Sequence, residues 1–454
     1  MLNKFNLLTG ILCSVSLLAI SPVHAETLYD VLAYTYENSL DLSAERSGQK
    51  ATDELVAKEK SGYRPAVQAT GNYGRSYGKY HYEELPSTRR YQNPRDVTLS
   101  VNQPVFSGLS TYNAVESARK QVKAGQANLL SAEQATLLDA TAVYMDVIRD
   151  MAVLDLQISN EKVLKKHLQS YRKRFSVGDL TNTDVAQSEA RASGATANRI
   201  AAEGNLKVSK ANFFSVVGME PENLQDLPDI NIALPENLDE AIAVALKQNP
   251  QIKAAEYIRQ AAEHTVSAKK GALLPSVNVG AQVSRQYENL TIEEADYWQV
   301  SAGMTVPIYN TGRDYADIRE AKHLENKYRI LWAKTCQDVR AETIAAWENY
   351  QSTKAQIKSI KDQIKASKIA LDGVIREARV GSRTVLDVLD AEQEHLDNQV
   401  SLVKVHRDEI VSAFALLSAI GKMNQAGLNL DVKPYDPRDY YEEVKNKWIG
   451  YGID

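Results

Sequence analysis

The sequence Val380-Gly381-Ser382-Arg383-Thr384-Val385-Leu386-Asp387-Val388-Leu389-Asp390 joins a glycine turn to a helix whose first turns carry two carboxylates. Because Asp387 and Asp390 are three residues apart, a helix places them on one face. The same signal occurs 203 positions earlier, as Val177-Gly178-Asp179-Leu180-Thr181-Asn182-Thr183-Asp184-Val185. The chain therefore contains this turn and helix start twice.

The repetition extends over the whole chain. Residues 28–44 align with 238–254 at an offset of 210, and residues 213–218 align with 416–421 at an offset of 203. One length change of seven residues, between Pro65 and Pro104, accounts for the difference. Repetition over such a distance indicates an internal duplication of one structural unit.

We divide the chain accordingly into five segments. They are a signal peptide (1–25), a first structural repeat (26–219), an inter-repeat equatorial linker (220–237), a second structural repeat (238–422) and a C-terminal equatorial tail (423–454).

The N-terminus has the pattern of an export signal. Lys4 precedes an apolar run over residues 7–20, and small residues precede Glu26, where we expect the mature chain to begin. An N-terminal membrane anchor is the alternative, although the run is short for a span. With the signal removed, Cys336 is the remaining cysteine, so no intrachain disulfide is expected.

Composition limits the partner classes. The chain is 44% hydrophobic and 24% charged, and no later stretch has about 18 consecutive apolar residues, so a membrane contact would use strands rather than helices. The net charge of −5 argues against a nucleic-acid partner.

Two strands are expected in each half. In the second half Val277, Val279, Ala281 and Val283 alternate with polar residues, and the alternation resumes from Trp298 to Val306. Residues 67–73 and 97–101 repeat the pattern, which is typical of strands with one apolar and one polar face. Residues 80–96 and 287–297 are expected to form polar loops.

Very long helices follow the strands. Residues 111–175 and 315–377 contain no proline, and each stretch is far longer than a usual globular helix. At about 1.5 Å per residue, roughly 65 residues form a rod about 100 Å long. Helices are also expected over 28–62 and 238–271, before the strands, and over 184–217 and 386–420, after the glycine turns. In the first rod, apolar or small residues recur at intervals of three and four, from Val115 through Gly125 and Met151 to Phe175.

Four strands do not close a barrel, because about eight are needed to enclose a filled interior. An open sheet leaves unpaired edges, which a bilayer core does not tolerate. Several copies of the chain are therefore expected to share one barrel.

With these features the chain resembles the TolC family of outer-membrane efflux channels. The resemblance rests on the duplication, Pro65 and Pro275, the segments 103–106 and 306–309, and the two glycine turns at 174–178 and 380–391. The resemblance implies a mainly α fold with a transmembrane β-barrel. Duplicated long antiparallel helices would form an α-helical tunnel, and four strands per chain would form a shared trimeric barrel.

The resemblance also implies a function. The homotrimer would lie in the outer membrane of a Gram-negative bacterium, in contact with outer-membrane lipid, and extend into the periplasm. It would export drugs, toxic compounds or proteins together with a periplasmic adaptor (membrane fusion protein) and an inner-membrane pump of RND or ABC type. No enzymatic activity and no cofactor are implied.

By the same resemblance, the tunnel would be gated at the helix tips by Thr183, Asp184, Arg383, Asp387 and Asp390. Glu394, four residues beyond Asp390 on the same helical face, is expected to add a third acidic ring. Rings of carboxylates would attract cations, and their repulsion is expected to raise some of their pKa values. A link from Arg383 to Asp184 is expected to hold the tips closed. Ala378 stands where the family pattern can carry a hydrogen-bonding tyrosine, so one latch is expected to be missing.

The turns themselves are expected to contact the adaptor. The residues concerned are Val177, Gly178, Asp179, Val380, Gly381 and Ser382.

Other interpretations remain open from the residues alone. Asp387 and Asp390 could be carboxylates that favour a helix N-terminus. An exported coiled-coil structural or adhesive protein would explain the rods but not the strands, and an adaptor would carry one hairpin rather than two. The histidines are scattered, and no H-E-x-x-H, G-x-S-x-G or P-loop motif occurs, which argues against an enzyme.

Overall fold

The two halves of the chain fold alike, as the computed structural model shows for residues 27–81, 86, 88–225, 232–289 and 292–453. The first half contains α1 (Leu28–Asn38), α2 (Leu40–Lys60), the 3-10 turn η1 (Ser61–Tyr63), β1 (Ala66–Tyr73), β4 (Arg95–Ser107), α3 (Ser110–Ser176) and α4 (Asn182–Val217). The second contains α5 (Leu238–Gln248), α6 (Pro250–Gly271), β5 (Ser276–Asn289), β6 (Ile292–Thr305), α7 (Arg313–Arg379) and α8 (Val385–Ala419). The proposed signal peptide and Glu26 lie outside the described residues.

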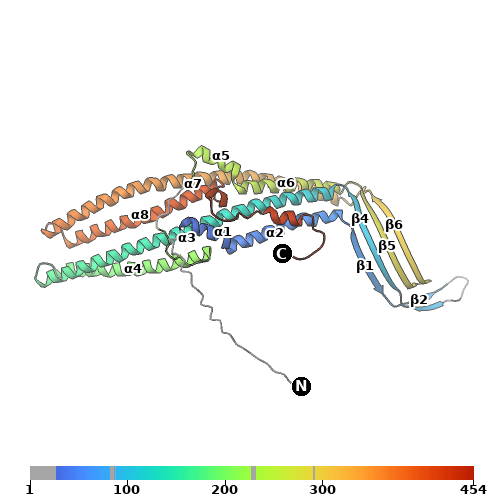
Figure 1. Cartoon of the computed structure of the whole chain (residues 1–454), viewed down its shortest axis with the longest axis horizontal. Helices are drawn as coiled ribbons and strands as arrows, with labels where there is room; N and C mark the ends of the chain where they lie inside the picture. Colours follow the sequence, from blue (N-terminus) through green and yellow to red (C-terminus); the bar gives the residue numbers. More distant parts are fainter. Residues whose placement is uncertain (1–26, 82–85, 87, 226–231, 290–291, 454) are drawn as a thin grey trace, which may run out of the picture.

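The two rods are confirmed. Helices α3 and α7 have 67 residues each, which corresponds to about 100 Å at 1.5 Å per residue. Helix α3 packs against α4, α7 packs against α8, and the two hairpins meet where α3 lies beside α8. Figure 1 shows both hairpins extending away from the sheet, which lies at the opposite end of the molecule.

The helices before the strands are broken, whereas the sequence predicted one continuous helix in each half. Ser39 ends α1 and caps α2, where its side chain accepts a hydrogen bond from Leu42 N. Asn249 does the same between α5 and α6 with Gln251 N, and Pro250 begins α6. The break recurs at the duplication offset because a capping side chain, reinforced by proline in the second half, favours a new helix start.

The four long strands form one antiparallel sheet in the order β1-β4-β5-β6, so the halves join where β4 pairs with β5. Within the described part of the chain, β1 and β6 each pair on one side only. Four strands per chain were predicted, and the sheet confirms them.

Two predicted loops were wrong. Residues 80–96 contain β3 (Thr88–Gln92), which pairs with β2 (Ser76–Tyr80) as a separate hairpin. The rings of Tyr77 and Tyr91 face each other across it at 4.8 Å, the type of cross-strand pair that stabilises a hairpin. Residues 287–297 are mostly strand, because β5 and β6 continue nearly to the turn.

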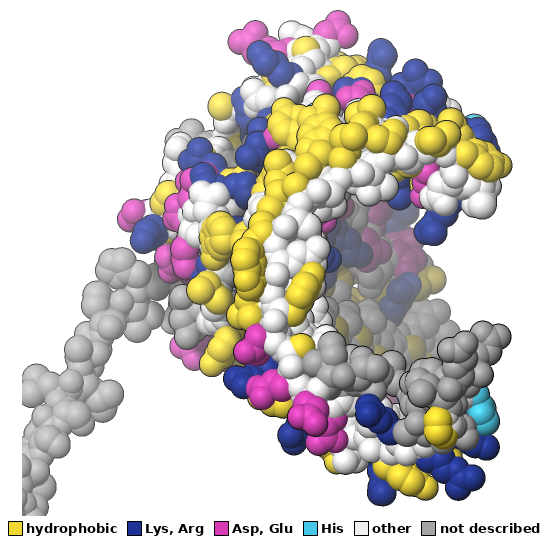
Figure 2. Space-filling view, turned by 90° about the vertical axis from the view of Figure 1, so that its right-hand side faces the viewer, with side chains coloured by type: hydrophobic (Ala, Val, Ile, Leu, Met, Phe, Trp, Pro, Cys, Tyr) yellow, Lys and Arg dark blue, Asp and Glu magenta, His cyan; other side chains and the backbone are white. Residues whose placement is uncertain are grey.

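One face of the sheet is apolar and exposed. The register aligns Ala69, Leu99, Val283 and Trp298 in one row across all four strands. The exposed apolar side chains of this face are Val67, Val97, Leu99, Val283, Trp298, Val300 and Met304. Figure 2 shows hydrophobic side chains gathered along one side of the curved sheet.

The opposite face of the sheet is polar. There Thr98 donates a hydrogen bond to Ser284 at 2.8 Å. Strict alternation along each strand produces this separation, as the sequence predicted. None of the described helices is long and apolar enough to cross a bilayer.

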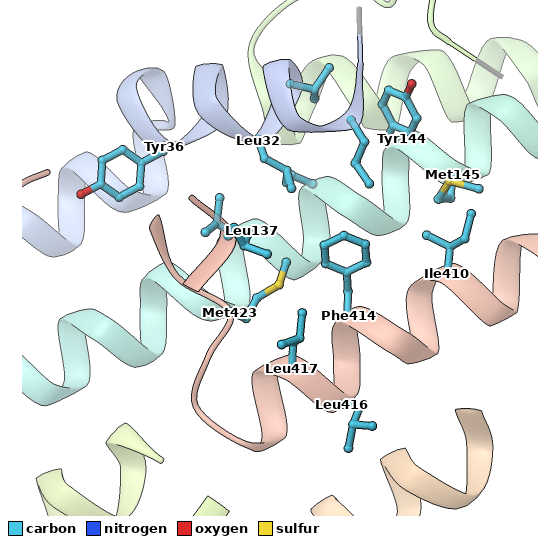
Figure 3. Packing of buried hydrophobic residues seen from close by; sticks show 14 of the residues in the cluster. Leu32, Tyr36, Leu137, Tyr144, Met145, Ile410, Phe414, Leu416, Leu417 and Met423 are labelled. Carbon is cyan, nitrogen blue, oxygen red and sulfur yellow. The ribbon is translucent and has the colours of Figure 1, made fainter. Parts of the chain in front are cut away.

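The main core lies midway along the rods, where α1, α3, α5, α7, α8 and the tail meet. Phe414 of α8 is fully buried there, and Figure 3 shows it facing Leu32 and Leu137. The tail contributes Leu428 and Leu430 to this core. Leu428 ends the short helix α9 (Gln425–Leu428), and Tyr435 N then donates a hydrogen bond to Tyr36 Oη at 2.9 Å. The tail continues into α10 (Arg438–Val444), which packs against α2.

The predicted seam of the first rod is only partly buried. Val115, Ala118 and Val122 are buried, whereas Met151 and Ile158 are exposed in the single chain. Gly125 lies in close contact with α2: a Cβ there would lie 2.2 Å from Oε1 of Gln49, whose side chain would have to move.

Candidate functional site

Both glycine turns close their rods with the same backbone motif. After α3, Gly178 N donates to Phe175 O and Asp179 N donates to Arg174 O, each at 2.9 Å. After α7, the corresponding bonds involve Gly381 and Ser382, and both glycines have a φ of 82°. This is a Schellman motif, which needs a left-handed residue that glycine adopts without strain. The preceding residues, Val177 and Val380, are 79% and 80% exposed, so the motif leaves an apolar side chain at each tip.

The carboxylates of Asp184 and Asp387 cap their own helices. Thr181 N and Oγ1 donate to Asp184 Oδ2 at 2.9 and 2.6 Å, and Asp184 N donates to Thr181 Oγ1 at 3.2 Å. Thr384 and Asp387 make the same three bonds at the start of α8. Each pair is a reciprocal capping box. The sequence signal was a threonine three residues before each aspartate, which our sequence interpretation missed.

These capping bonds set the charge of the two carboxylates. The side-chain and backbone hydrogen bonds from Thr181 lower the pKa of Asp184. The backbone and side-chain bonds from Thr384 lower the pKa of Asp387. The sequence analysis expected repulsion between copies to raise some pKa values of the carboxylate rings. Within one chain, the pKa values of Asp184 and Asp387 are lowered instead, because donors at a helix N-terminus stabilise the ionised carboxylate.

Arg383 does not reach Asp184, so the expected link is absent from this conformation of the chain. Its Nε donates instead to Glu377 Oε2 at 2.9 Å, across the turn of its own hairpin. Both side chains are about half exposed (51% and 52%), so the pair contributes only about 0–1 kcal/mol. Within one chain, Arg383 therefore contacts the end of its own rod.

Arg191 of α4 makes the connection between hairpins that was expected of Arg383. Its Nη2 lies 2.5 Å from Oδ1 of Asp390 on α8. Asp390 is the one predicted gate residue that the structure brings against the other hairpin, while Thr183 and Glu394 are exposed on their helices. Asp184 and Asp387 cap their own helices, whereas Asp390 forms an ion pair that links the two hairpins.

A second polar tie lies deeper in the same interface. His167 Nε2 of α3 lies 2.8 Å from Glu392 Oε1 of α8, and their side chains are 29% and 9% exposed. The His167 ring stacks on Tyr171. Around this pair, an apolar cluster joins α3, α4 and α8 through Leu164, Tyr171, Ala192, Ala195, Val385 and Leu389.

Sequence reasoning missed both ties because the duplication does not repeat them. At the offset of 203, Arg191 corresponds to Glu394 and His167 corresponds to Ala370. The sequence signal at Arg191 and His167 is that the equivalent residue of the other repeat has the opposite charge (Glu394) or no charge (Ala370).

Comparisons with known proteins agree with the fold. The family described as outer membrane efflux protein matches residues 32–219 and 241–422. The chain is 37% identical over 428 residues to the outer membrane efflux protein BepC of Brucella suis, covering 94% of this chain and 92% of that protein. It is 24% identical over 427 residues to the outer membrane protein TolC of Vibrio cholerae, covering 89% and 93%. The crystal structure of the Campylobacter jejuni CmeC outer membrane channel superposes with a TM-score of 0.78 at 14% identity, covering 92% and 89%.

These matches decide between the open alternatives. They extend over both repeats, which a coiled-coil structural protein or an adaptor would not explain. Family members are outer-membrane channels of Gram-negative bacteria that serve efflux and, as in the alkaline protease secretion protein AprF of Pseudomonas aeruginosa, secretion; their helical part extends into the periplasm, and they are not enzymes. The chain belongs to the outer membrane efflux protein family.

Proposed function

We propose that three copies of the chain assemble into one outer-membrane duct that exports small toxic compounds, drugs or proteins. The observation that carries the proposal is the open four-stranded sheet with one exposed apolar face. Three such sheets supply about twelve strands, more than the roughly eight that a closed barrel needs. Closure would pair the free edges of β1 and β6 between copies and turn the apolar face toward lipid.

The opposite end of the duct would be its gate. Three copies of Asp387, Asp390 and Glu394 around one axis would concentrate negative charge and attract cations. Arg191 holds Asp390 against the neighbouring hairpin, and His167 holds Glu392. Both pairs are weak enough for a partner to release, since an exposed ion pair contributes about 0–1 kcal/mol and a hydrogen bond to a charged group about 1.5–3 kcal/mol.

The two Schellman turns would be the surfaces that a periplasmic adaptor contacts. Val177 and Val380 present exposed apolar side chains there. Arg174 Nε lies 2.6 Å from Asp179 Oδ2, so the negative charge of the first turn is partly neutralised. An inner-membrane pump of RND or ABC type would complete the system.

Assembly is tested on protein extracted from outer membranes with detergent. We expect a mass of three chains by light scattering and ion conductance in planar bilayers. A folded monomer without conductance would refute the proposal.

The gate is tested with two arginine variants that differ in what the arginine joins. Arg191→Gln breaks a contact between hairpins, whereas Arg383→Gln breaks a contact within one tip. We expect a higher single-channel conductance for the first variant and a smaller effect for the second. Equal conductance of Arg191→Gln and the parent would count against the gate.

A further inference from the structure

The residues just before Asp454, the last residue of the sequence, form an exposed apolar segment. Residues 448–453, here called the C-terminal hexapeptide, read Trp-Ile-Gly-Tyr-Gly-Ile and contain no charged side chain. The exposed fractions of Trp448, Ile449, Tyr451 and Ile453 are 67%, 90%, 102% and 80%. The tail before them is packed, with Val444 fully buried. The side chains of the tail thus change from buried at Val444 to exposed at Trp448 within four residues.

The hexapeptide is held in place at its start. Arg64 Nη1 donates to Lys447 O at 2.8 Å, and its guanidinium lies 4.8 Å from the centre of the Trp448 ring. Lys60, four residues before Arg64, donates from Nζ to Oδ1 of Asn446 at 2.7 Å. Trp448 is therefore docked at the end of α2 that leads into the sheet. The chain then turns back along α2 (Figure 1), so that Ile453 lines the same pocket as Arg46 and Lys50.

This docking point coincides with the start of the apolar face of the sheet. Arg64 is two residues before β1, and Val67, the second residue of β1, is 65% exposed on the apolar face. In an embedded barrel the water-to-lipid boundary on the periplasmic side would therefore fall near Arg64. Tryptophan and tyrosine concentrate at such boundaries, because their rings are apolar and their polar atoms stay hydrated.

The surroundings of Trp448 are basic. Partial burial, and then the charges of Arg119, Lys445 and Arg64, lower the pKa of Lys60, and the charge of Glu442 opposes this shift. Arg119 is paired with Glu116 and Lys445 with Glu442, whereas Lys60 and Arg64 donate to uncharged oxygens. Two cations beside an apolar segment complement a phospholipid, which combines an anionic phosphate with acyl chains.

We propose that Trp448 and Ile449, at the start of the C-terminal hexapeptide, insert into the periplasmic leaflet of the outer membrane as an interfacial anchor, with Lys60 and Arg64 facing phospholipid phosphates. The proposal rests on the barrel of the proposed function. It gives each copy a second attachment to lipid, outside the strands. It also explains why apolar side chains are left exposed at the end of an otherwise packed tail.

A nitroxide label at Ile449→Cys tests the anchor, in a parent in which Cys336 is replaced by serine. The labelled protein is reconstituted into vesicles of phosphatidylethanolamine and phosphatidylglycerol. Collision with oxygen, which partitions into lipid, is compared with collision with a water-soluble nickel chelate. We expect the oxygen-to-nickel ratio at 449 to be several-fold higher than at a matched label on Glu443→Cys, an exposed position of α10.

Each outcome of this experiment either supports or overturns the anchor. A ratio at 449 equal to that at 443 would place the start of the hexapeptide in water and overturn the anchor. A label shielded from both reagents would mean that a neighbouring copy covers it, which also overturns the proposal. A label at Val300→Cys, on the apolar face of β6, must report lipid; if it does not, the barrel itself fails and the proposed function is refuted separately.

Discussion

The pair of His167 and Glu392 makes the stability of the helix tips depend on pH. The hydrogen bond to Glu392 raises the pKa of His167; burial opposes this effect and the Glu392 charge adds to it. A raised folded pKa means that the stabilisation is fully present below the unfolded value of about 6.5 and is lost as pH rises through the folded value. The tips should therefore loosen as the periplasm becomes alkaline.

The size of the effect follows from the burial of the pair. Glu392 is 9% exposed, and its Oε2 has no hydrogen-bond partner among the described residues. The hydrogen bond from His167 therefore offsets most of the cost of burying the Glu392 carboxylate. A hydrogen bond to a charged group contributes about 1.5–3 kcal/mol. Replacing His167 with glutamine should change the opening equilibrium of the tips roughly ten- to hundred-fold, since about 1.4 kcal/mol corresponds to tenfold.

Amide hydrogen exchange of the assembled protein measures this equilibrium. Peptides from the ends of α3 and α8 should exchange faster in His167→Gln than in the parent at about pH 6, after correction for intrinsic rates. At about pH 9 the two proteins should differ little, because the parent has then lost the same charge. His406→Gln is the matched control: His406 pairs at 3.6 Å with Glu409 of its own helix and joins no hairpins.

Two results would refute this reasoning. One is parent protein whose tips exchange equally at both pH values. The other is a His406→Gln variant with the same effect as His167→Gln, which would indicate a general rather than a local cause.

Three further predictions concern stability, measured as thermal unfolding of the detergent-solubilised protein. Gly381→Ala should cost about 1–2 kcal/mol, because φ is 82° there; Gly373→Ala, within α7 with open space around it, should not lower the unfolding temperature. Phe414→Ala should cost about 3–5 kcal/mol, because Phe414 is fully buried, whereas Phe214→Ala, at a side chain that is 50% exposed, should cost about 0.5 kcal/mol or less. Thr384→Ala should cost about 1 kcal/mol through loss of the capping box. An unchanged unfolding temperature in Gly381→Ala, Phe414→Ala or Thr384→Ala would contradict the corresponding mechanism.

Some errors of sequence interpretation came from local signals that were present but not used. The serine at 39 and the Asn249-Pro250 pair mark the breaks in the helices before the strands. The threonines three residues before Asp184 and Asp387 mark capping boxes. These signals act within a few residues, so closer attention to the sequence finds them.

The duplication, the two rods, their glycine turns and the alternating strands could all be predicted from the residues alone, because periodicity, helix caps and glycine conformations depend on neighbours within a few residues. The strand order that joins β4 to β5, and the partners of Asp390 and Glu392, became visible only in the folded chain. Those partners are far apart along the chain, and an ion pair between distant residues leaves no periodic pattern in either segment. Arg383 shows the reason most directly: its charge was visible in the sequence, but the direction in which it reaches depends on how the two hairpins pack.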